Sequence, residues 1–401
     1  MMKKICAVVL FFICVFSVGV WEGTFEKRWV VNTTPNSEKL ILKGVFIADS
    51  PYQNITIVET SIATDTKKEN ENYYVVYERD YPERENLVYA RARVFSCYAP
   101  KIKEDPLLTG QPIFSENEKT MYNEFIKAKA DGLKKETVLE TIVALNDFVH
   151  EYVNYNESAA EENSAIEVYA NPQGVCVEYP HPLLAILHAV GIDHSMVYGY
   201  AYSKKWEPHV WVEAYIPGYG WMDVDPTYGQ VGFLDGRRIA MNINTKKERI
   251  YDYVQLKNGE VDFEYSLYTN PEHEGDFDLV TINISYNWPY FVVSVENKND
   301  FYVFGAYEIN FPANISDSER KTIILRPREA AVFKYRINEG ELSDGYVYFV
   351  DIKARFVDDV EEKRFEIRKP AVVVEKHNKE KEWWEIIIEE IMKLFGLYSG
   401  S

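Results

Sequence analysis

The chain is poor in cysteine and in basic residues. Four cysteines occur among 401 residues, and two of them, Cys6 and Cys14, lie in the first apolar stretch. A secreted protein held together by disulfides would carry more cysteines in even pairs, so that class is excluded. Lys and Arg number 44 against 63 Asp and Glu, which gives a formal net charge of −19. This balance argues against a nucleic-acid partner, because phosphate binding needs clustered Lys and Arg.

Sequence motifs for metal binding are also missing. The chain contains neither H-E-x-x-H nor C-x-x-C, the spacings typical of catalytic and structural zinc sites. His188 lies on one predicted helix, and His181 and His194 flank it. We interpret these three histidines as structural or surface residues. We therefore expect no metal and no other cofactor.

A long apolar run occurs only at the N-terminus. Lys3 and Lys4 precede the apolar residues 5–20, and Ser17-Val18-Gly19 offers small side chains for cleavage. This pattern predicts a signal peptide or N-terminal anchor over residues 1–22. The run is short for a membrane-spanning helix, so cleavage and retention both stay open. The expected location is secreted or cell-surface, with membrane attachment if the segment is kept.

The rest of the chain predicts several domains of an α+β fold. With 401 residues the chain exceeds one ordinary core, and 46% of it is hydrophobic, enough for more than one core. Short β-branched and aromatic runs predict a β-sandwich-like domain over residues 24–112 and an immunoglobulin-like β-sandwich over 255–370. Between them, residues 113–250 combine strand patterns with helical periodicity, which is clearest over 136–153.

Residues 371–401 predict a charged linker followed by an amphipathic helix. Its apolar face consists of residues at helical spacing: Trp384, Ile387, Ile388, Ile391, Leu394 and Phe395. The helix is too short and too charged to span a bilayer. It could dock on its own protein, bind a partner or lie in a membrane surface, and the acidic polar face argues against the last. The sequence leaves the oligomeric state open.

The stretch from Gly174 to Thr227 carries the candidate chemistry. Cys176 precedes residues with helical spacing that end at Gly191, so we expect it at or just before a helix N-terminus. Backbone N–H groups and the helix dipole there favour the thiolate. A buried structural cysteine and a disulfide with Cys97 are the alternatives. We prefer a free thiol at Cys176 and treat Cys97 as a small buried residue.

His209 opens a strand pattern, and a turn and a second strand follow it up to Asp225. Opposed residues of an antiparallel pair share a face. An odd loop such as 217–219 therefore puts His209 and Asp225 on one face, whereas an even loop separates them. Asp223 is the competing carboxylate, and we favour Asp225 for its place at the strand end. A thiol, an imidazole and a carboxylate can act as nucleophile, base and orienting group.

Several short motifs occur in order: Ser164-Ala165-Ile166, Gly174-Val175-Cys176, Leu183-Leu184-x-x-Leu187, Gly191-Ile192, Tyr198-Gly199-Tyr200, His209-Val210-Trp211-Val212-Glu213 and Gly220-Trp221-x-x-Val224-Asp225-Pro226-Thr227. Through these motifs the chain resembles the transglutaminase-like superfamily from about Glu136 to Gly232. The resemblance implies a papain-like α+β core with a Cys-His-Asp triad. Carried over to this sequence, Cys176 is the nucleophile, His209 the base and Asp225 the residue that orients the base.

Together these features predict an exported cysteine-dependent enzyme that transfers acyl groups from amide bonds of a peptide or protein substrate through a thioester. Resolution by water would make it a peptidase or amidase, which we favour. Resolution by an amine would make it a cross-linking transglutaminase acting on protein glutamines. The remaining alternative is a catalytically inactive cell-surface binding protein, because β-sandwiches often bind partners.

Overall fold

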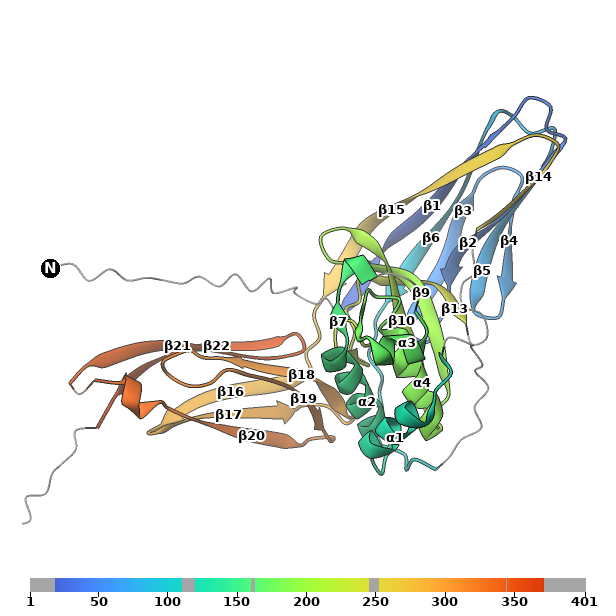
Figure 1. The fold of residues 1–401 in the computed structure, drawn as a ribbon. Coiled ribbons are helices and arrows are strands. Elements are labelled where there is room, and N and C mark those ends of the chain that lie inside the picture. Colours follow the sequence, from blue (N-terminus) through green and yellow to red (C-terminus); the bar gives the residue numbers. More distant parts are fainter. Residues whose placement is uncertain (1–18, 110–119, 160–162, 245–251, 344, 371–401) are drawn as a thin grey trace, which may run out of the picture.

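The computed structural model describes residues 19–109, 120–159, 163–244, 252–343 and 345–370. A helical layer stands at the middle of an elongated molecule, with β-sheets on either side of it (Figure 1). The predicted signal segment lies outside the described residues up to residue 18, and the predicted C-terminal helix lies outside them entirely. No helix of the described part is long and apolar enough to cross a membrane.

Two four-stranded antiparallel sheets pack together in the N-terminal part. Their strand orders are β15-β1-β6-β3 and β14-β2-β5-β4. Alternate residues of β1 point inward, and Trp21, Phe25 and Trp29 share one core with Leu40 and Leu42 of β2. Side chains that alternate between two faces in this way are typical of a β-strand. The bounds are β1 Val20–Thr33, β2 Lys39–Ala48, β3 Gln53–Thr60, β4 Thr64–Glu69, β5 Asn72–Asp80, β6 Glu85–Ser96, β14 Tyr253–Lys257 and β15 Val261–Gly275.

The hairpin of β14 and β15 belongs to the N-terminal sheets, whereas we predicted that the C-terminal sandwich begins at residue 255. β14 pairs with β2, and β15 pairs with β1 from one end to the other. Asn258 and Gly259 lie in the turn between the two strands and have positive φ, as an Asn-Gly hairpin turn requires. The C-terminal sandwich therefore does not begin at residue 255, since its first strand starts at Val280. A strand pattern in the sequence shows that a segment is extended but does not identify its partner, so this return was not predicted.

The central part joins four helices to a five-stranded sheet of order β12-β11-β10-β9-β13. Helix α4 is buried along most of its length, because it packs against the other three helices and against β9 and β10. The helix predicted over 136–153 is confirmed as α2. The bounds are α1 Glu124–Leu133, α2 Val138–Tyr152, α3 Ala165–Ala170, α4 Pro180–Val190, β9 His194–Tyr202, β10 Trp206–Ile216, β11 Gly220–Asp225, β12 Gln230–Val231 and β13 Arg238–Asn244, with the short pieces β7 Asn154–Tyr155, η2 Glu157–Ala159 and β8 Gln173–Gly174.

Seven strands form two layers in the C-terminal part. One sheet has the order β16-β17-β20 and the other β19-β18-β21-β22. The core between them contains Phe291, Val293, Phe304 and Ile352, all fully buried. The bounds are β16 Val280–Asn287, β17 Tyr290–Asn297, β18 Val303–Asn310, β19 Glu319–Leu325, β20 Ala330–Arg336, η3 Glu339–Glu341, β21 Val347–Phe356 and β22 Asp359–Arg368.

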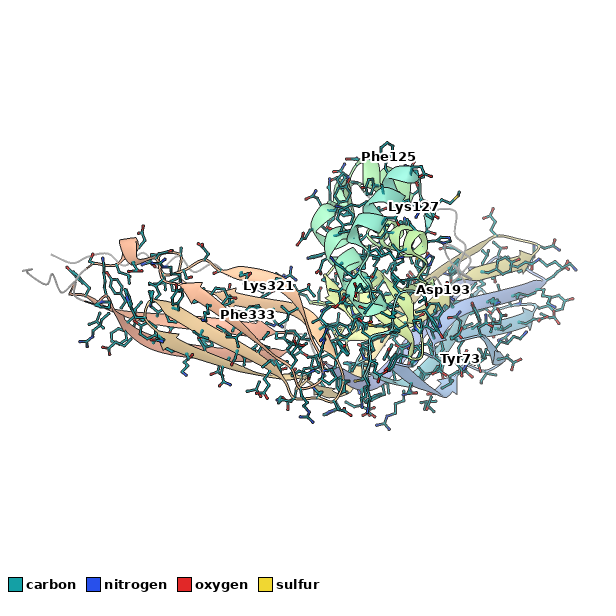
Figure 2. The ribbon with its side chains drawn as sticks, turned by 90° about the horizontal axis from the view of Figure 1, so that it is seen from below. Tyr73, Phe125, Lys127, Asp193, Lys321 and Phe333 are labelled. Carbon is teal, nitrogen blue, oxygen red and sulfur yellow. The ribbon has the colours of Figure 1, made fainter. Side chains whose placement is uncertain are left out.

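The helices project to one side of the line that joins the two sets of sheets. Figure 2 shows Phe125 and Lys127 of α1 at the tip of this projection, far from Lys321 and Phe333 in the C-terminal sheets. The C-terminal part docks onto the core through the ring of Phe233, whose edge meets Phe277 and Phe304 at centroid distances of 5.6 and 5.2 Å. The molecule is thus a mixed α+β protein with sheets on both sides of a helical core.

Candidate active site

The hairpin of β10 and β11 brings His209 and Asp225 together. Val212 lies opposite Val224 and Ile216 opposite Gly220, so residues 217–219 form the loop. The odd loop required by the sequence argument is therefore confirmed. His209 Nε2 lies 2.6 Å from Asp225 Oδ2, and the two side chains are 4% and 0% exposed. A buried hydrogen bond of this kind fixes the orientation of the imidazole and leaves Nδ1 as its other nitrogen.

Asp225 is held in its ionised form. Its Oδ1 accepts hydrogen bonds from the backbone N–H groups of Thr227 and Tyr228 at 3.0 and 3.3 Å. Arg238 Nη1 lies 2.8 Å from Oδ2. Burial alone would raise the pKa of Asp225, but His209, Arg238 and the hydrogen bonds outweigh it and lower the pKa to about 2. The carboxylate is therefore charged at any ordinary working pH.

Asp223 faces a different partner. It lies opposite Glu213 in the ladder, and its Oδ1 accepts a hydrogen bond from Trp211 Nε1 at 2.5 Å. Burial is the largest influence on Asp223 and raises its pKa to about 7, although Trp211 and Arg238 act in the opposite direction. Asp225, and not Asp223, is thus the carboxylate that contacts His209.

Cys176 lies in a turn between β8 and the first residue of α4. The N–H groups of Glu178 and Tyr179 both bond to Val175 O, so the turn winds directly into the helix. The thiol of Cys176 donates to Pro208 O at 3.9 Å, next to His209 in the chain. Cys176 and Cys97 are both free cysteines, which contradicts the alternative of a disulfide between them.

The groups around Cys176 raise the pKa of its thiol, whereas we expected from the sequence that they would favour the thiolate. Burial is the largest influence, and the charges of Asp225 and Glu178 add to it, so the pKa of the thiol rises to about 11. Hydrogen bonds from the backbone N–H groups of Val210 and Cys176 lower the pKa, but they do not outweigh burial and the two charges together. Glu178 folds back so that its Oε2 accepts from Val175 N–H at 2.8 Å. A carboxylate therefore lies in the turn that contains Cys176, where we had expected only N–H groups.

Cys176 and His209 line one cleft of about 330 Å³. Part of its wall comes from the N-terminal sheets, through Lys27, Val45 and Tyr265. Lys27 forms a buried ion pair with Asp252, with 3.0 Å between Nζ and Oδ2. The pair is neutral as a whole, so this end of the cleft presents aromatic and apolar surface without net charge.

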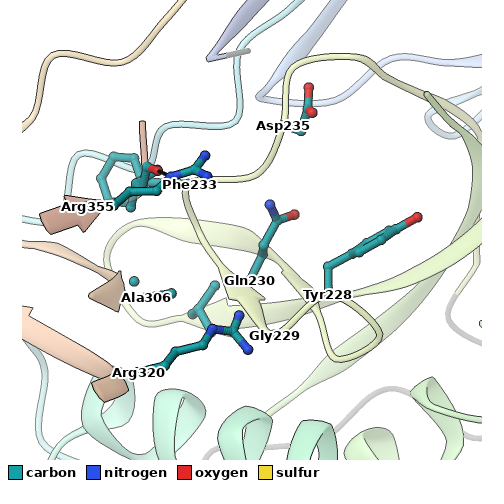
Figure 3. A pocket seen from close by; sticks show the side chains of 11 residues that line it. Tyr228, Gly229, Gln230, Phe233, Asp235, Ala306, Arg320 and Arg355 are labelled. Atoms are coloured by element: carbon teal, nitrogen blue, oxygen red, sulfur yellow. Dashed lines mark hydrogen bonds between the residues drawn. The ribbon is translucent and has the colours of Figure 1, made fainter. Parts of the chain in front are cut away.

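A second hollow of about 200 Å³ lies between the loop after Asp225 and the C-terminal sheets. Figure 3 shows Tyr228 and Gln230 on one side of it and Arg320 and Arg355 on the other. The ring of Tyr228 also lies 5.1 Å from that of His209. The loop after Asp225 therefore borders both His209 and the C-terminal part.

The other histidines singled out in the sequence lie away from the cleft. His194 is buried, and burial lowers its pKa to about 4. His181 Nδ1 lies 2.6 Å from Asn163 O. Within the part of the chain that the structure describes, no group of three or more His, Cys, Asp or Glu side chains could hold a metal ion.

Sequence reasoning missed Arg238, the cation beside Asp225. The signal that could have found it is a charged residue directly before the apolar run Ile239-Ala240-Met241. An arginine at the start of a buried strand needs a partner, because an unpaired buried charge is costly. The sequence does not show which of the many acidic residues that partner is.

Comparison with protein families matches residues 127–226 to the transglutaminase-like superfamily. This segment is a transglutaminase-like superfamily domain. It begins within α1, ends just after Asp225 and contains Cys176 and His209. The domain makes up about a quarter of the chain, and the sheets of the N-terminal and C-terminal parts lie outside it.

Two solved structures match the chain at low sequence identity. One, named a "putative cysteine protease" from Cytophaga hutchinsonii, is 14% identical with a TM-score of 0.42 and covers 65% of this chain and 96% of its own. The other, named a "putative protease" from Parabacteroides distasonis, is 10% identical with a TM-score of 0.20 and covers 80% and 90%. A search of curated proteins gives no match.

Proposed function

We propose that this protein is an exported cysteine-dependent enzyme that transfers acyl groups from amide bonds of peptides or proteins. The observation that carries the proposal is the buried contact of 2.6 Å between His209 Nε2 and Asp225 Oδ2, in a cleft that Cys176 also lines. An imidazole fixed through one nitrogen offers the other to a thiol. Cys176 is the nucleophile, His209 the general base and acid, and Asp225 the group that orients the ring.

The reaction proceeds in two halves. Cys176 Sγ attacks the amide carbonyl carbon while His209 Nδ1 takes the thiol proton. The C–N bond then breaks, His209 gives that proton to the leaving amine, and the acyl group remains on Sγ as a thioester. A water molecule or an amine attacks the thioester and passes a proton to His209. The C–S bond breaks, and the sulfur recovers the proton, which restores the starting site.

Backbone N–H groups are the donors for the oxyanion of the tetrahedral intermediate. The N–H groups of Cys176 and Val210 point at the thiol and lower its pKa against the effect of burial. Donors fixed in a partly dry cleft stabilise developing negative charge more than the same groups in water. These N–H groups therefore support binding of the substrate carbonyl oxygen close to Cys176 Sγ.

Hydrolysis is the favoured outcome, because cross-linking requires capture of an amine in preference to bulk water. Cross-linking of protein glutamines is the second candidate, since the same thioester serves both reactions. A catalytically inactive binding protein is the third, supported by the sheets that flank the core and opposed by the complete set of three triad residues. The apolar N-terminal run supports export to the cell surface or beyond it.

Turnover of a peptide library tests the proposal. The full chain, Cys176→Ala and the matched control Cys97→Ala are incubated with the library, with and without a primary amine. Cys176→Ala should lose at least about a thousand-fold in turnover, as expected when a nucleophile is removed, while Cys97→Ala keeps the activity of the parent. New carboxyl ends indicate hydrolysis, and amine adducts indicate transamidation. Unchanged turnover in Cys176→Ala would reject the mechanism.

A further inference from the structure

We propose that Arg238 is a positioning residue of the triad, which holds Asp225 in the orientation and charge state that His209 requires. This inference rests on the proposed function, because it assigns a role in the same reaction. Arg238 begins β13, the strand that pairs with β9 on the side away from β10. The proposal therefore extends the site from the β10–β11 hairpin to the far edge of the sheet.

Arg238 and His209 share one oxygen of Asp225. Arg238 Nη1 lies 2.8 Å from Oδ2, and His209 Nε2 lies 2.6 Å from the same atom. The Oδ1 atom is occupied by the backbone N–H groups of Thr227 and Tyr228. A carboxylate held from three directions cannot turn away from the imidazole, which is the geometric requirement for orienting a base.

Arg238 is itself fixed. Its Nη2 donates to Gln230 Oε1 at 2.6 Å. The rings of Trp211 and Tyr228 face the guanidinium, at 5.7 and 5.4 Å from Cζ to the ring centres. The side chain is only 2% exposed. Cation–π contacts and one short hydrogen bond give the guanidinium a single position, so Asp225 has a rigid partner.

Stability alone does not explain a buried arginine here. Moving two charges out of water costs several kcal/mol per ion, and packed apolar side chains often serve stability as well or better. A buried carboxyl without a cation tends to become protonated instead. A protonated Asp225 would no longer carry the charge that stabilises the imidazolium formed in the reaction. Arg238 therefore keeps Asp225 ionised, and the proposed reaction needs that negative charge beside His209.

The charged and titratable groups around Asp225 come from each neighbouring element. His209 faces it from β10, Arg238 from β13 and Tyr228 from the following loop. Asp223 on the same strand and Cys176 before α4 also feel its charge. Among these neighbours Arg238 is the permanent cation, because His209 changes its charge during the reaction. Loss of Arg238 therefore leaves the carboxylate without a fixed counter-charge.

The test compares Arg238→Gln and Arg238→Lys with Arg237→Gln. Arg237 is a matched control, since it is adjacent in the chain and pairs with Asp235 at 3.0 Å. All variants are made in the full chain with Cys6→Ala, Cys14→Ala and Cys97→Ala, so that Cys176 is the one thiol left to measure. The pH dependence of peptide turnover and of iodoacetamide alkylation of Cys176 are both recorded. Alkylation needs no knowledge of the substrate.

Arg238→Gln should lower kcat at least about tenfold with little change in KM, because the defect lies in the base and not in binding. The acid limb of both pH profiles should move to higher pH, since Asp225 becomes easier to protonate. Arg238→Lys should recover part of both effects, and Arg237→Gln should behave as the parent. A folded Arg238→Gln variant with unchanged kcat and unchanged acid limbs would overturn the proposal.

Gln230→Ala serves if Arg238→Gln does not fold. It removes the acceptor for Arg238 and keeps the charge, so a smaller shift of the alkylation limb in the same direction is expected, and no shift contradicts the proposal. The two hypotheses fail separately. Turnover that survives Cys176→Ala rejects the proposed function, whereas Cys176-dependent turnover with parental pH profiles in the Arg238 variants rejects the positioning role alone.

Discussion

Cys176 is surrounded by groups that oppose its ionisation. Burial, Asp225 and Glu178 raise the pKa of the thiol to about 11, above the ordinary value of about 8.5. At neutral pH the resting thiol is therefore protonated unless a nearby base takes its proton. In the proposed mechanism His209, which lines the same cleft, is that base, and Asp225 supports the charge that the imidazole then acquires. By this mechanism the reactivity of the sulfur depends on the proton transfer and not on a stable thiolate.

Replacing His209 should expose the unfavourable surroundings of the thiol. In a background with Cys6, Cys14 and Cys97 replaced by alanine, His209→Ala should slow alkylation of Cys176 at pH 8 by at least about tenfold, because roughly one thiol in a thousand is ionised three pH units below its pKa. The rate should then climb with pH towards 11. The measurement is the alkylation rate by iodoacetamide from pH 5 to 11.

His188→Ala is the control for that measurement, since His188 lies on α4 outside the cleft and should leave the profile unchanged. Equal alkylation rates at pH 8 in the His209→Ala variant and the parent would show that the imidazole does not assist the thiol. A rate that levels off near pH 8 in His209→Ala would show that the surroundings of the sulfur do not oppose its ionisation.

At the residue scale the sequence singled out the three candidate residues of the site but not the groups that surround them. Cys176, His209 and Asp225 stand out because of their order and their strand pattern. The fold-back of Glu178 onto Val175 N–H and the pairing of Arg238 with Asp225 follow no periodicity. They depend on three-dimensional proximity across a turn and across a sheet. The direction in which the pKa of the thiol shifts could therefore not be predicted from the sequence.

At the scale of elements, strands β9, β10 and β13 carry His209, Arg238 and one wall of the cleft. Gly199 on β9 lies directly opposite His209 and lines the cleft. A Cβ at this position would lie 2.1 Å from Ile239 O on β13 and 2.8 Å from the ring of Trp211. The three strands therefore approach one another at a point where only glycine fits.

Gly199→Ala should destabilise the fold by about 1–3 kcal/mol, the usual range for overpacking a filled interior. The backbone oxygen of Ile239 cannot move without shifting β13, so Arg238 should move as well and activity should fall. Chemical denaturation measures the loss. Gly132→Ala is the matched control, since a Cβ there meets open space near the end of α1 and alanine favours a helix by up to about 1 kcal/mol.

A Gly199→Ala variant as stable as the parent would contradict the close approach of the three strands. So would a Gly132→Ala variant that loses as much stability as Gly199→Ala, because the effect would then not come from the contact with Ile239 O.

The sequence predicted where helices and turns lie better than it predicted which strands pair with each other. Helix α2 and the turn between β10 and β11 follow from local periodicity and turn residues, whereas the odd length of that turn comes from the structure. The return of β14 and β15 to the N-terminal sheets does not, because a strand of alternating residues can join either sandwich equally well by pattern. Its placement depends on long-range pairing along the whole of β1, which only the folded chain reveals.

At the scale of the whole molecule, the two sets of sheets contact opposite sides of the site. The N-terminal sheets supply part of the cleft wall through Val45 and Tyr265. The C-terminal sheets reach the loop after Asp225 through His150, which lies 3.0 Å from Pro226 O and 3.2 Å from Arg320 Nη1. The transglutaminase-like domain is therefore contacted by sheets on both sides.

The most direct test of the account is the mass of a trapped acyl-enzyme. The Cys97→Ala chain is mixed with an activated acyl ester and quenched in acid, and its peptides are then mapped by mass spectrometry. The account predicts one acyl group on Cys176, lost again when the protein is returned to neutral pH with water or an amine, and no acylation in Cys176→Ala. An acyl group on another side chain, or none on Cys176 while substrate is turned over, would contradict it.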